Sequence, residues 1–318
     1  MNKKEVIVLI DEPLHIDKRV QNIIKRHDNP IVEDCSELLP FSIYMYFLNA
    51  SILLKALILS PFYWFKLKKK YKLKPKAFAS GIKTSLRVST AAIKKFLCLK
   101  YRYKDRNIST IYANDLRCGI IGMYLAKYLN AELIYDAHEV EFHRNRKNSL
   151  LRVVFEIIIE RKVINKAKQI IVVNKPIAAV YRDIYQISKD KISIVNNMFF
   201  EQYYGYALDH FINDIVQPVI TYVGAGIRGR KLEKLTKEAI EADIDLYGFF
   251  LLKNPQISLG QPWKLVSRGE YLPVLLELVK TNRLAMWACT ENLCLSYRLS
   301  LGNKFFQAMA IGIPVIAS

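Results

Sequence analysis

The chain has few glycines and prolines and no C-x-x-C pair of cysteines. Its 318 residues include 12 glycines and 11 prolines beside a hydrophobic content of 52%. This composition excludes a low-complexity or disordered chain. The five cysteines are odd in number and form no C-x-x-C pair, so neither a disulfide framework nor a cysteine zinc site is expected. A chain of this length can bury two ordinary cores, and we expect two domains.

Acidic residues are too few to balance the basic ones. Aspartate and glutamate number 29 against 48 lysines and arginines, which gives a formal net charge of +19. Such a balance is typical of proteins that meet nucleic acid, an anionic membrane surface or phosphorylated ligands. Much of the excess lies between residues 66 and 104, where residues 66–76 read KLKKKYKLKPK. No zinc-finger, RRM or helix-turn-helix pattern accompanies the charge, so no nucleic-acid partner is expected.

A nearly continuous apolar and aromatic segment, residues 38–65, precedes these basic residues. Its longest uncharged run, residues 38–54, approaches the roughly 20 residues that span a membrane, but it contains Pro40 and Asn49. Three interpretations stay open: a spanning helix, a core helix with a solvated basic face, and an interfacial helix on anionic lipid. Apolar and aromatic residues beside a polybasic run favour the third.

The apolar stretch near the N-terminus, in MNKKEVIVLIDEPLH, is too short for a signal peptide and is typical of a first β-strand. We therefore expect a cytoplasmic protein that is peripheral at the inner face of the cell membrane.

Short apolar runs alternate with longer stretches of helical periodicity. The runs typical of strands are residues 5–10, 108–113, 132–136, 169–174, 192–196, 219–224 and 244–248. Alternation of this kind predicts βαβ units and parallel sheets, and so an α/β fold. The aromatic and acidic segment 199–217 interrupts the pattern. We predict a first domain at 1–205, which carries the basic and apolar insertion at about 38–104, and a second at 206–318.

A glycine-rich sequence, GAGIRG at residues 224–229, follows one predicted strand and precedes a predicted helix. It matches the G-x-G-x-x-G fingerprint of dinucleotide-binding proteins. That fingerprint also needs an acidic residue at the end of the next strand, where this chain has Gly-Phe-Phe at 248–250. A nucleotide-sugar suits the loop equally, because Arg228 and Arg230 could make charge-assisted bonds to a diphosphate. A glycine turn with solvated cations is the remaining alternative.

Three ionisable residues, Asp136, His138 and Glu139, follow the strand predicted at 132–136. They would lie at the carboxyl end of a parallel strand, where open α/β sheets bind ligands. A catalytic His138 and a surface or helix-capping cluster are both open readings. The spacing of His138 and His143 does not match the two histidines of an H-E-x-x-H zinc helix, and no metal is expected. The D-x-D at 243–245 lies at the start of a predicted strand and is interpreted as a strand cap.

The last residues, GNKFFQAMAIGIPVIAS at 302–318, predict a short helix, a glycine turn and a buried strand. Asn303 and Lys304 open that helix, where free backbone N–H groups and the helix dipole favour an anion. The run resembles the donor-site signature of GT-B glycosyltransferases, especially the family 4 enzymes that build bacterial surface polysaccharides. The D-A-H-E at 136–139 and the D-x-R-V at 17–20 resemble two further elements of that family.

This resemblance implies two Rossmann-like domains that face a cleft. It also implies retaining transfer of a sugar from a nucleoside-diphosphate sugar to a saccharide or lipid-linked acceptor, as in capsule or lipopolysaccharide synthesis, without a metal or other cofactor. The residues it assigns are His138, Asp136 and Glu139 for catalysis; Gly224, Gly226, Arg228, Arg230, Asn303, Lys304 and Gln307 for donor binding; and Asp17 and Arg19 on the acceptor side.

The chain departs from the family pattern at three places. Gln307 and Leu299 stand where family members usually have glutamates, and the sequence ends at Ser318, where members continue with further helices. We therefore expect a truncated second domain. The alternatives are a catalytically impaired, membrane-associated GT-B-like subunit or fragment, and an NAD(P)-dependent enzyme that uses the glycine-rich loop.

Overall fold

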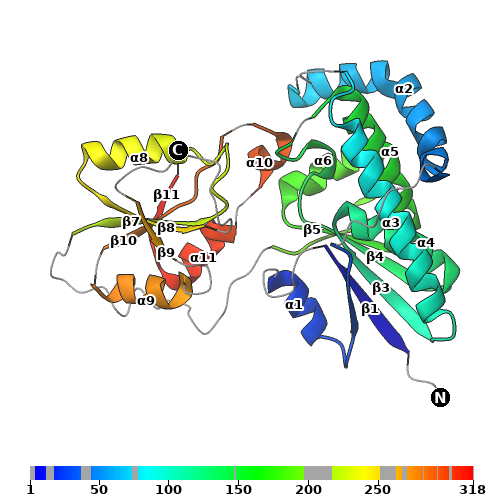
Figure 1. The fold of residues 1–318 in the computed structure, drawn as a ribbon, viewed down its shortest axis with the longest axis horizontal. Coiled ribbons are helices and arrows are strands. Elements are labelled where there is room, and N and C mark those ends of the chain that lie inside the picture. The colour runs from blue at the N-terminus through cyan, green and yellow to red at the C-terminus, as the bar shows by residue number, and fades with distance from the viewer. Residues whose placement is uncertain are drawn as a thin grey trace. The chain divides into compact units, whose positions relative to one another are not determined.

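The protein is a two-unit α/β chain (Figure 1). The computed structural model describes residues 4–11, 18–36, 44–73, 78–146, 148–196, 217–250, 263–266, 271–281, 283–291, 293–300 and 303–317. Unit 1 holds Met1–Asn196 and Cys294–Ser300, and unit 2 holds Asn197–Leu293 and Leu301–Ser318. The boundary predicted at residue 205 falls in the segment 197–216, outside the described residues.

Unit 1 is built on a parallel sheet of six strands in the order β2-β1-β3-β4-β5-β6. The strands are β1 Glu5–Ile10, β2 Ile31–Asp34, β3 Ile108–Asn114, β4 Glu132–Ala137, β5 Gln169–Val172 and β6 Ile192–Ile194. The order runs outward from β1 to β2 and then resumes with β3 on the other side of β1. The sheet therefore has a topological switch point between β1 and β3, the position where open α/β sheets bind ligands.

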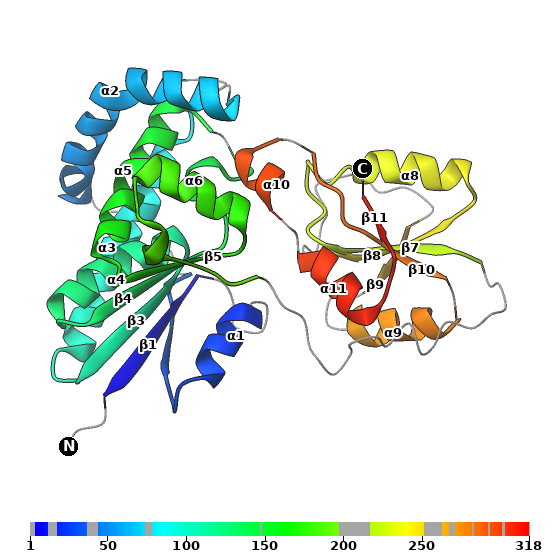
Figure 2. The same cartoon turned by 180° about the vertical axis from the view of Figure 1, so that it is seen from behind.

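Helices cover both faces of this sheet, as Figures 1 and 2 show. The helices of unit 1 are α1 Lys18–Lys25, α2 Tyr44–Tyr71, α3 Ile82–Tyr103, α4 Asp115–Tyr128, α5 Leu150–Lys166, α6 Lys175–Tyr185 and the late α10 Leu295–Leu299, with 3-10 turns η1 Glu141–His143 and η2 Lys189–Lys191. Alternate residues of β1 serve the two faces: Ile7 and Leu9 join the main core, whereas Val8 packs with Val20 of α1. Burial on both faces explains why β1 reads as a continuous apolar run.

The predicted basic and apolar insertion forms two long helices, α2 and α3, which pack on α5. Asn49, inside the apolar helix α2, is buried and hydrogen-bonded to α3. Its Nδ2 donates to Thr90 Oγ1 over 3.2 Å, and its Oδ1 accepts from Ser89 Oγ over 2.8 Å. These bonds satisfy an amide that would otherwise be costly to bury. They also join α2 to α3 at a defined register.

Unit 2 contains a second parallel sheet, of five strands in the order β11-β10-β7-β8-β9. The strands are β7 Val219–Gly224, β8 Asp245–Phe250, β9 Trp263–Val266, β10 Leu284–Trp287 and β11 Val315–Ile316, and the helices are α8 Leu232–Glu241, α9 Tyr271–Thr281 and α11 Asn303–Ile311. One apolar cluster joins α8 to one face of the sheet, and another joins α9 and α11 to the other. The switch point of this sheet lies between β7 and β10.

Candidate functional site

In unit 1, His138 lies between two carboxylates at the carboxyl edge of the sheet. Its Nε2 is 3.5 Å from Oδ2 of the fully buried Asp136, and its Nδ1 is 3.9 Å from Asp115 Oδ1. Its backbone N–H also donates to Asp115 Oδ1 over 3.3 Å. Asp136 ends strand β4 with its neighbour Ala137, whereas Asp115 begins helix α4 beyond strand β3. The ends of two adjacent strands therefore place a carboxylate near each ring nitrogen of His138.

Asp115 has an unusual backbone conformation, with φ of 61°. A left-handed residue that is not glycine is uncommon, and such positions cluster at functional sites. Burial opposes ionisation of Asp115, but the charges of His138 and Arg144 outweigh burial and lower its pKa. Asp115 is therefore a carboxylate at neutral pH, available to orient His138.

Arg144 connects the remaining acidic groups of this edge. Its Nε lies 3.0 Å from Glu139 Oε2, and its guanidinium is 3.2 Å from Glu141 Oε1 and 3.6 Å from Asp115 Oδ2. Burial raises the pKa of Glu141 well above its usual range in spite of Arg144. Three acidic side chains thus lie against the same arginine, and the pKa of Glu141 is raised while that of Asp115 is lowered. The sequence reading missed Asp115, Glu141 and Arg144, because no local motif relates the end of β3 to the turn after β4.

The late segment Cys294–Ser300 belongs to this edge of unit 1. The Leu295 N–H donates to His143 Nδ1 over 3.0 Å, and Ser296 Oγ donates to Glu139 Oε2 over 3.0 Å. Burial lowers the pKa of His143 to about 4, so its imidazole is neutral at pH 7 and can accept the Leu295 bond. His143 therefore has a structural partner of its own, and the described residues hold no group of three or more His, Cys, Asp or Glu placed to bind a metal.

In unit 2, Lys304 meets the glycine-rich loop at the switch point of the sheet. Gly224, the last residue of β7, has φ of 146°, which strongly favours glycine. A Cβ placed there would lie 2.8 Å from Lys304 Nζ and 3.1 Å from the Tyr222 hydroxyl. The lysine nitrogen is also 5.1 Å from the centroid of the Tyr222 ring. The backbone conformation at residue 224 therefore favours glycine, and a side chain there would displace the end of Lys304.

The charge of Lys304 is poorly solvated in this position. Burial, together with the charge of nearby Arg230, lowers the pKa of Lys304 to about 7. The Arg230 backbone carbonyl accepts from Trp287 Nε1 over 3.0 Å, which ties the loop to the end of β10. Two cations and a glycine loop thus lie together, and the charge of Arg230 disfavours the charged form of Lys304. A bound anion would favour that charged form.

The other predicted donor residues lie on the same loop and on α11. Gly226 is buried in the loop, Arg228 is exposed, and Gln307 is half-buried on α11. Asn303 is the first residue of α11. On the acceptor side, Asp17 lies outside the described residues, and Arg19 is the second residue of α1.

Comparison with known proteins reveals similarity of fold. No protein-family model and no curated protein matches the chain in sequence. Among solved structures, sucrose-phosphate synthase from Thermosynechococcus elongatus superimposes with a TM-score of 0.56 at 18% identity, covering 72% of this chain and 61% of that chain. A glycosyltransferase from Rickettsia africae ESF-5 superimposes with a TM-score of 0.55 at 12% identity, covering 100% of this chain and 79% of that one.

These matches, with the two parallel sheets, confirm the predicted fold class. The chain has two Rossmann-like domains of the GT-B type. It spans 61% of the length of the sucrose-phosphate synthase chain. At such identities the likeness establishes the fold, and the chemistry has to be argued from the residues.

Proposed function

We propose that this protein is a glycosyltransferase of the family 4 type, which moves a sugar from a nucleoside-diphosphate sugar to a saccharide or lipid-linked acceptor with retention of configuration. The pathway we propose is the synthesis of a bacterial cell-surface polysaccharide. The observation that carries the proposal is the contact of Lys304 with Gly224 at the switch point of the unit 2 sheet. A diphosphate at this point would meet Lys304, Arg230 and the first N–H groups of α11.

This arrangement suits a reaction whose leaving group is a nucleoside diphosphate. Negative charge grows on the diphosphate as the bond to the sugar breaks, and preorganised cations and helix N–H groups lower the energy of that transition state. We assign His138 to the reacting sugar, with Asp136 and Asp115 orienting its imidazole and Glu139 beside it. The residues supply the charge compensation themselves, so we propose transfer without a metal or other cofactor.

The reaction can be tested with the full chain and a panel of UDP-, GDP- and ADP-sugars beside NAD and NADP, measured by calorimetry. We expect one class of nucleotide-sugar to bind, and EDTA to leave binding and transfer unchanged. His138→Ala is expected to keep donor affinity but to lower the transfer rate by about 10²–10⁴-fold. Binding of NAD in place of every nucleotide-sugar would instead support the nicotinamide alternative.

Helix α2 supports a further part of the proposal, a peripheral position on an anionic membrane. Its Ile52, Ala56 and Leu67 face the core. The opposite face exposes a line of large apolar side chains spaced like one side of a helix: Leu54 at 59%, Ile58 at 68%, Phe62 at 66% and Phe65 at 72%. Lysines follow at the C-terminal end of the helix. The part Asn49–Tyr71 is long and apolar enough to cross a membrane, but a helix with one face packed on the core and the other exposed fits an interface better.

We therefore expect the protein to bind vesicles that contain anionic lipid, at the inner face of the cell membrane. Replacing Phe62 and Phe65 together by serine should weaken retention on phosphatidylglycerol vesicles at least about tenfold, because apolar burial and charge act jointly there. Ile240→Ser, which removes an exposed apolar side chain from α8 of unit 2, is the matched control. Sedimentation with vesicles at low and high salt measures both. Equal retention of the double variant and the control would contradict the assignment.

A further inference from the structure

A buried carboxyl group in unit 1 accepts hydrogen bonds from three tyrosine hydroxyls. Glu160, on α5, is fully buried. Its Oε1 accepts from Tyr135 over 2.7 Å and from Tyr181 over 2.6 Å, and its Oε2 accepts from Tyr185. Tyr135 belongs to β4, and the other two tyrosines belong to α6. One carboxyl group therefore links a central strand of the sheet to two helices.

The Tyr181 hydroxyl has a second acceptor, which belongs to the candidate site. Its oxygen lies 3.2 Å from the backbone carbonyl oxygen of Glu139, the residue that follows His138. A hydroxyl group has one proton, so it cannot donate fully to both acceptors at once. Among the described residues, Tyr135 and Tyr185 donate to Glu160 alone. Tyr181 is therefore the member of the cluster that can exchange one acceptor for another.

The two protonation states of Glu160 favour different acceptors for Tyr181. An ionised Glu160 accepts from all three hydroxyls, and a short bond to a charged oxygen is stronger than a longer one to a carbonyl. A protonated Glu160 is itself a donor. When its O–H points at the Tyr181 oxygen, the Tyr181 proton has to turn away, and the Glu139 carbonyl is the acceptor within reach. The added proton comes from solvent and stays on Glu160.

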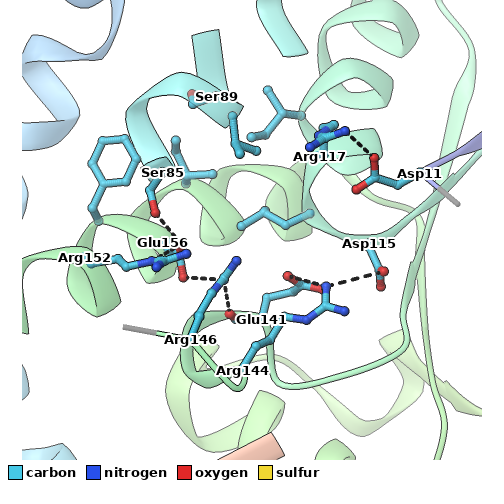
Figure 3. A pocket seen from close by; sticks show the side chains of 15 residues that line it. Asp11, Ser85, Ser89, Asp115, Arg117, Glu141, Arg144, Arg146, Arg152 and Glu156 are labelled. Carbon is cyan, nitrogen blue, oxygen red and sulfur yellow. Dashed lines mark hydrogen bonds and ion pairs between the residues drawn. The ribbon is translucent and has the colours of Figure 1, made fainter. Parts of the chain in front are cut away.

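Glu160 exchanges this proton near neutral pH. Burial raises its pKa to about 7, although the three tyrosine bonds act in the opposite direction. Figure 3 shows two nearby acids, Glu141 and Glu156, which are each paired with an arginine. The ionisable groups that act on the cluster, besides its own members, are Tyr63 of α2, Asp115 of α4, Glu141 of η1, and Glu156 and Arg161 of α5.

From this geometry we propose that Glu160 and Tyr181 are positioning residues for the segment that carries His138 and Glu139. With Glu160 protonated, Tyr181 donates to the Glu139 carbonyl and fixes the peptide group that follows His138. With Glu160 ionised, Tyr181 turns to the carboxylate and that peptide group loses the bond. The expected effect on sugar transfer rests on the proposed glycosyltransferase function, whereas the exchange of hydrogen bonds does not.

The sequence supplies a selective probe of this peptide group. Glutamate precedes valine at two places, Glu5–Val6 and Glu139–Val140. Full-length protein with carbon-13 in the glutamate carbonyls and nitrogen-15 in the valines therefore gives two carbonyl–amide correlations by NMR. The first is an internal reference, because the Glu5 carbonyl accepts from a hydroxyl that has no such exchange, Ser109 Oγ, over 3.2 Å. We expect the Val140 signal to shift with a midpoint near pH 7 and the Val6 signal to stay in place.

Tyr181→Phe removes the exchanging hydroxyl and should abolish the shift of Val140. Tyr185→Phe is the matched control on the same helix. It takes a donor from Glu160 but keeps the Tyr181 bonds, so the shift should persist and its midpoint should move to higher pH. His138→Ala should keep the shift as well, which separates it from titration of the neighbouring imidazole.

Glu160→Gln is neutral at every pH and should also abolish the shift, which provides a second variant if Tyr181→Phe does not fold. A Val140 signal that does not titrate in the wild type would overturn the proposal. So would a shift that persists unchanged in folded Tyr181→Phe or Glu160→Gln protein.

Transfer kinetics test the consequence for the reaction. At saturating donor, kcat of the wild type should fall about three- to tenfold as Glu160 ionises, the worth of one neutral hydrogen bond. Tyr181→Phe should lose this fall, while Tyr185→Phe keeps it. Equal pH profiles of kcat for Tyr181→Phe and the wild type would overturn the role in transfer. Silence of the nucleotide-sugar panel beside an intact Val140 shift would instead reject the transferase proposal and leave the exchange of hydrogen bonds standing.

Discussion

Lys304→Ala is expected to lower the rate of sugar transfer by about 10²–10³-fold, the usual cost of removing one preorganised group that stabilises transition-state charge. The lysine touches the glycine loop at Gly224, so its ammonium group lies where the backbone can also approach a diphosphate. Lys237→Ala, which removes an exposed cation from α8, should leave transfer unchanged. Steady-state kinetics with the nucleotide-sugar found in the panel provides the measurement. Equal rates for Lys304→Ala and the wild type would exclude this donor site.

The same lysine gives the donor affinity a defined pH dependence. Because burial and Arg230 lower the pKa of Lys304 to about 7, much of the free protein has a neutral amine there above pH 7. A bound diphosphate favours the charged form, so binding takes up a proton and affinity should fall as the pH rises from 7 to 9. Lys304→Arg stays charged over this range and should lose the dependence. Calorimetry in two buffers of different ionisation enthalpy would detect the proton.

Glu156→Ala should destabilise unit 1 by about 3–5 kcal/mol, the range found when one partner of a buried ion pair is removed. Glu156 is buried on α5 and accepts from Ser85 Oγ at 2.5 Å, from Arg152 Nε at 3.0 Å and from Arg146 Nη2 at 2.8 Å. Its loss leaves Arg152 buried without this carboxylate. The substitution also removes one of the partners that position Arg146. The same arginine donates to the Glu141 carbonyl in the turn that follows β4, so that turn should be held less firmly.

Urea unfolding followed by far-ultraviolet circular dichroism measures this effect as a lower midpoint at unchanged slope. Glu156→Gln is the informative companion, since it keeps one acceptor oxygen and should lose less. Glu238→Ala, which removes an exposed carboxylate paired with Lys234, should change stability by at most about 1 kcal/mol. A loss for Glu156→Ala no larger than that of this control would show that the network contributes little.

The strand predictions succeeded where both faces of a strand are covered. Strands β1 and β7 appear as apolar runs because helices lie on each side of the sheet. Strands β2, β9 and β10 were not predicted. Each has four residues, and β2 reads Ile-Val-Glu-Asp while β9 contains an exposed Lys264. A run of four residues carries too little pattern to separate it from a loop, and the charged residues of β2 and β9 weaken that pattern further.

Part of the candidate site in unit 1 could likewise be predicted from a strand pattern in the sequence. Asp136, His138 and Glu139 follow a recognisable strand, and carboxyl ends of parallel strands collect ligand-binding groups. The partners of these residues could not be predicted from the sequence. Asp115 comes from the end of another strand, and Ser296 comes from a segment more than 150 residues later in the chain. Pairings over such distances depend on strand order, which local periodicity does not encode.

The sequence by itself determined the two α/β domains, the basic and apolar helices of the insertion, and the residue types at the strand ends, since each follows from local periodicity, composition or turn chemistry. The tertiary structure decided which of these residues meet. It brought His138 between Asp136 and Asp115, returned Cys294–Ser300 to unit 1, and set Lys304 against Gly224. The reason is physical: burial of apolar faces selects each element locally, but the charges that come together depend on how the strands are ordered within each sheet.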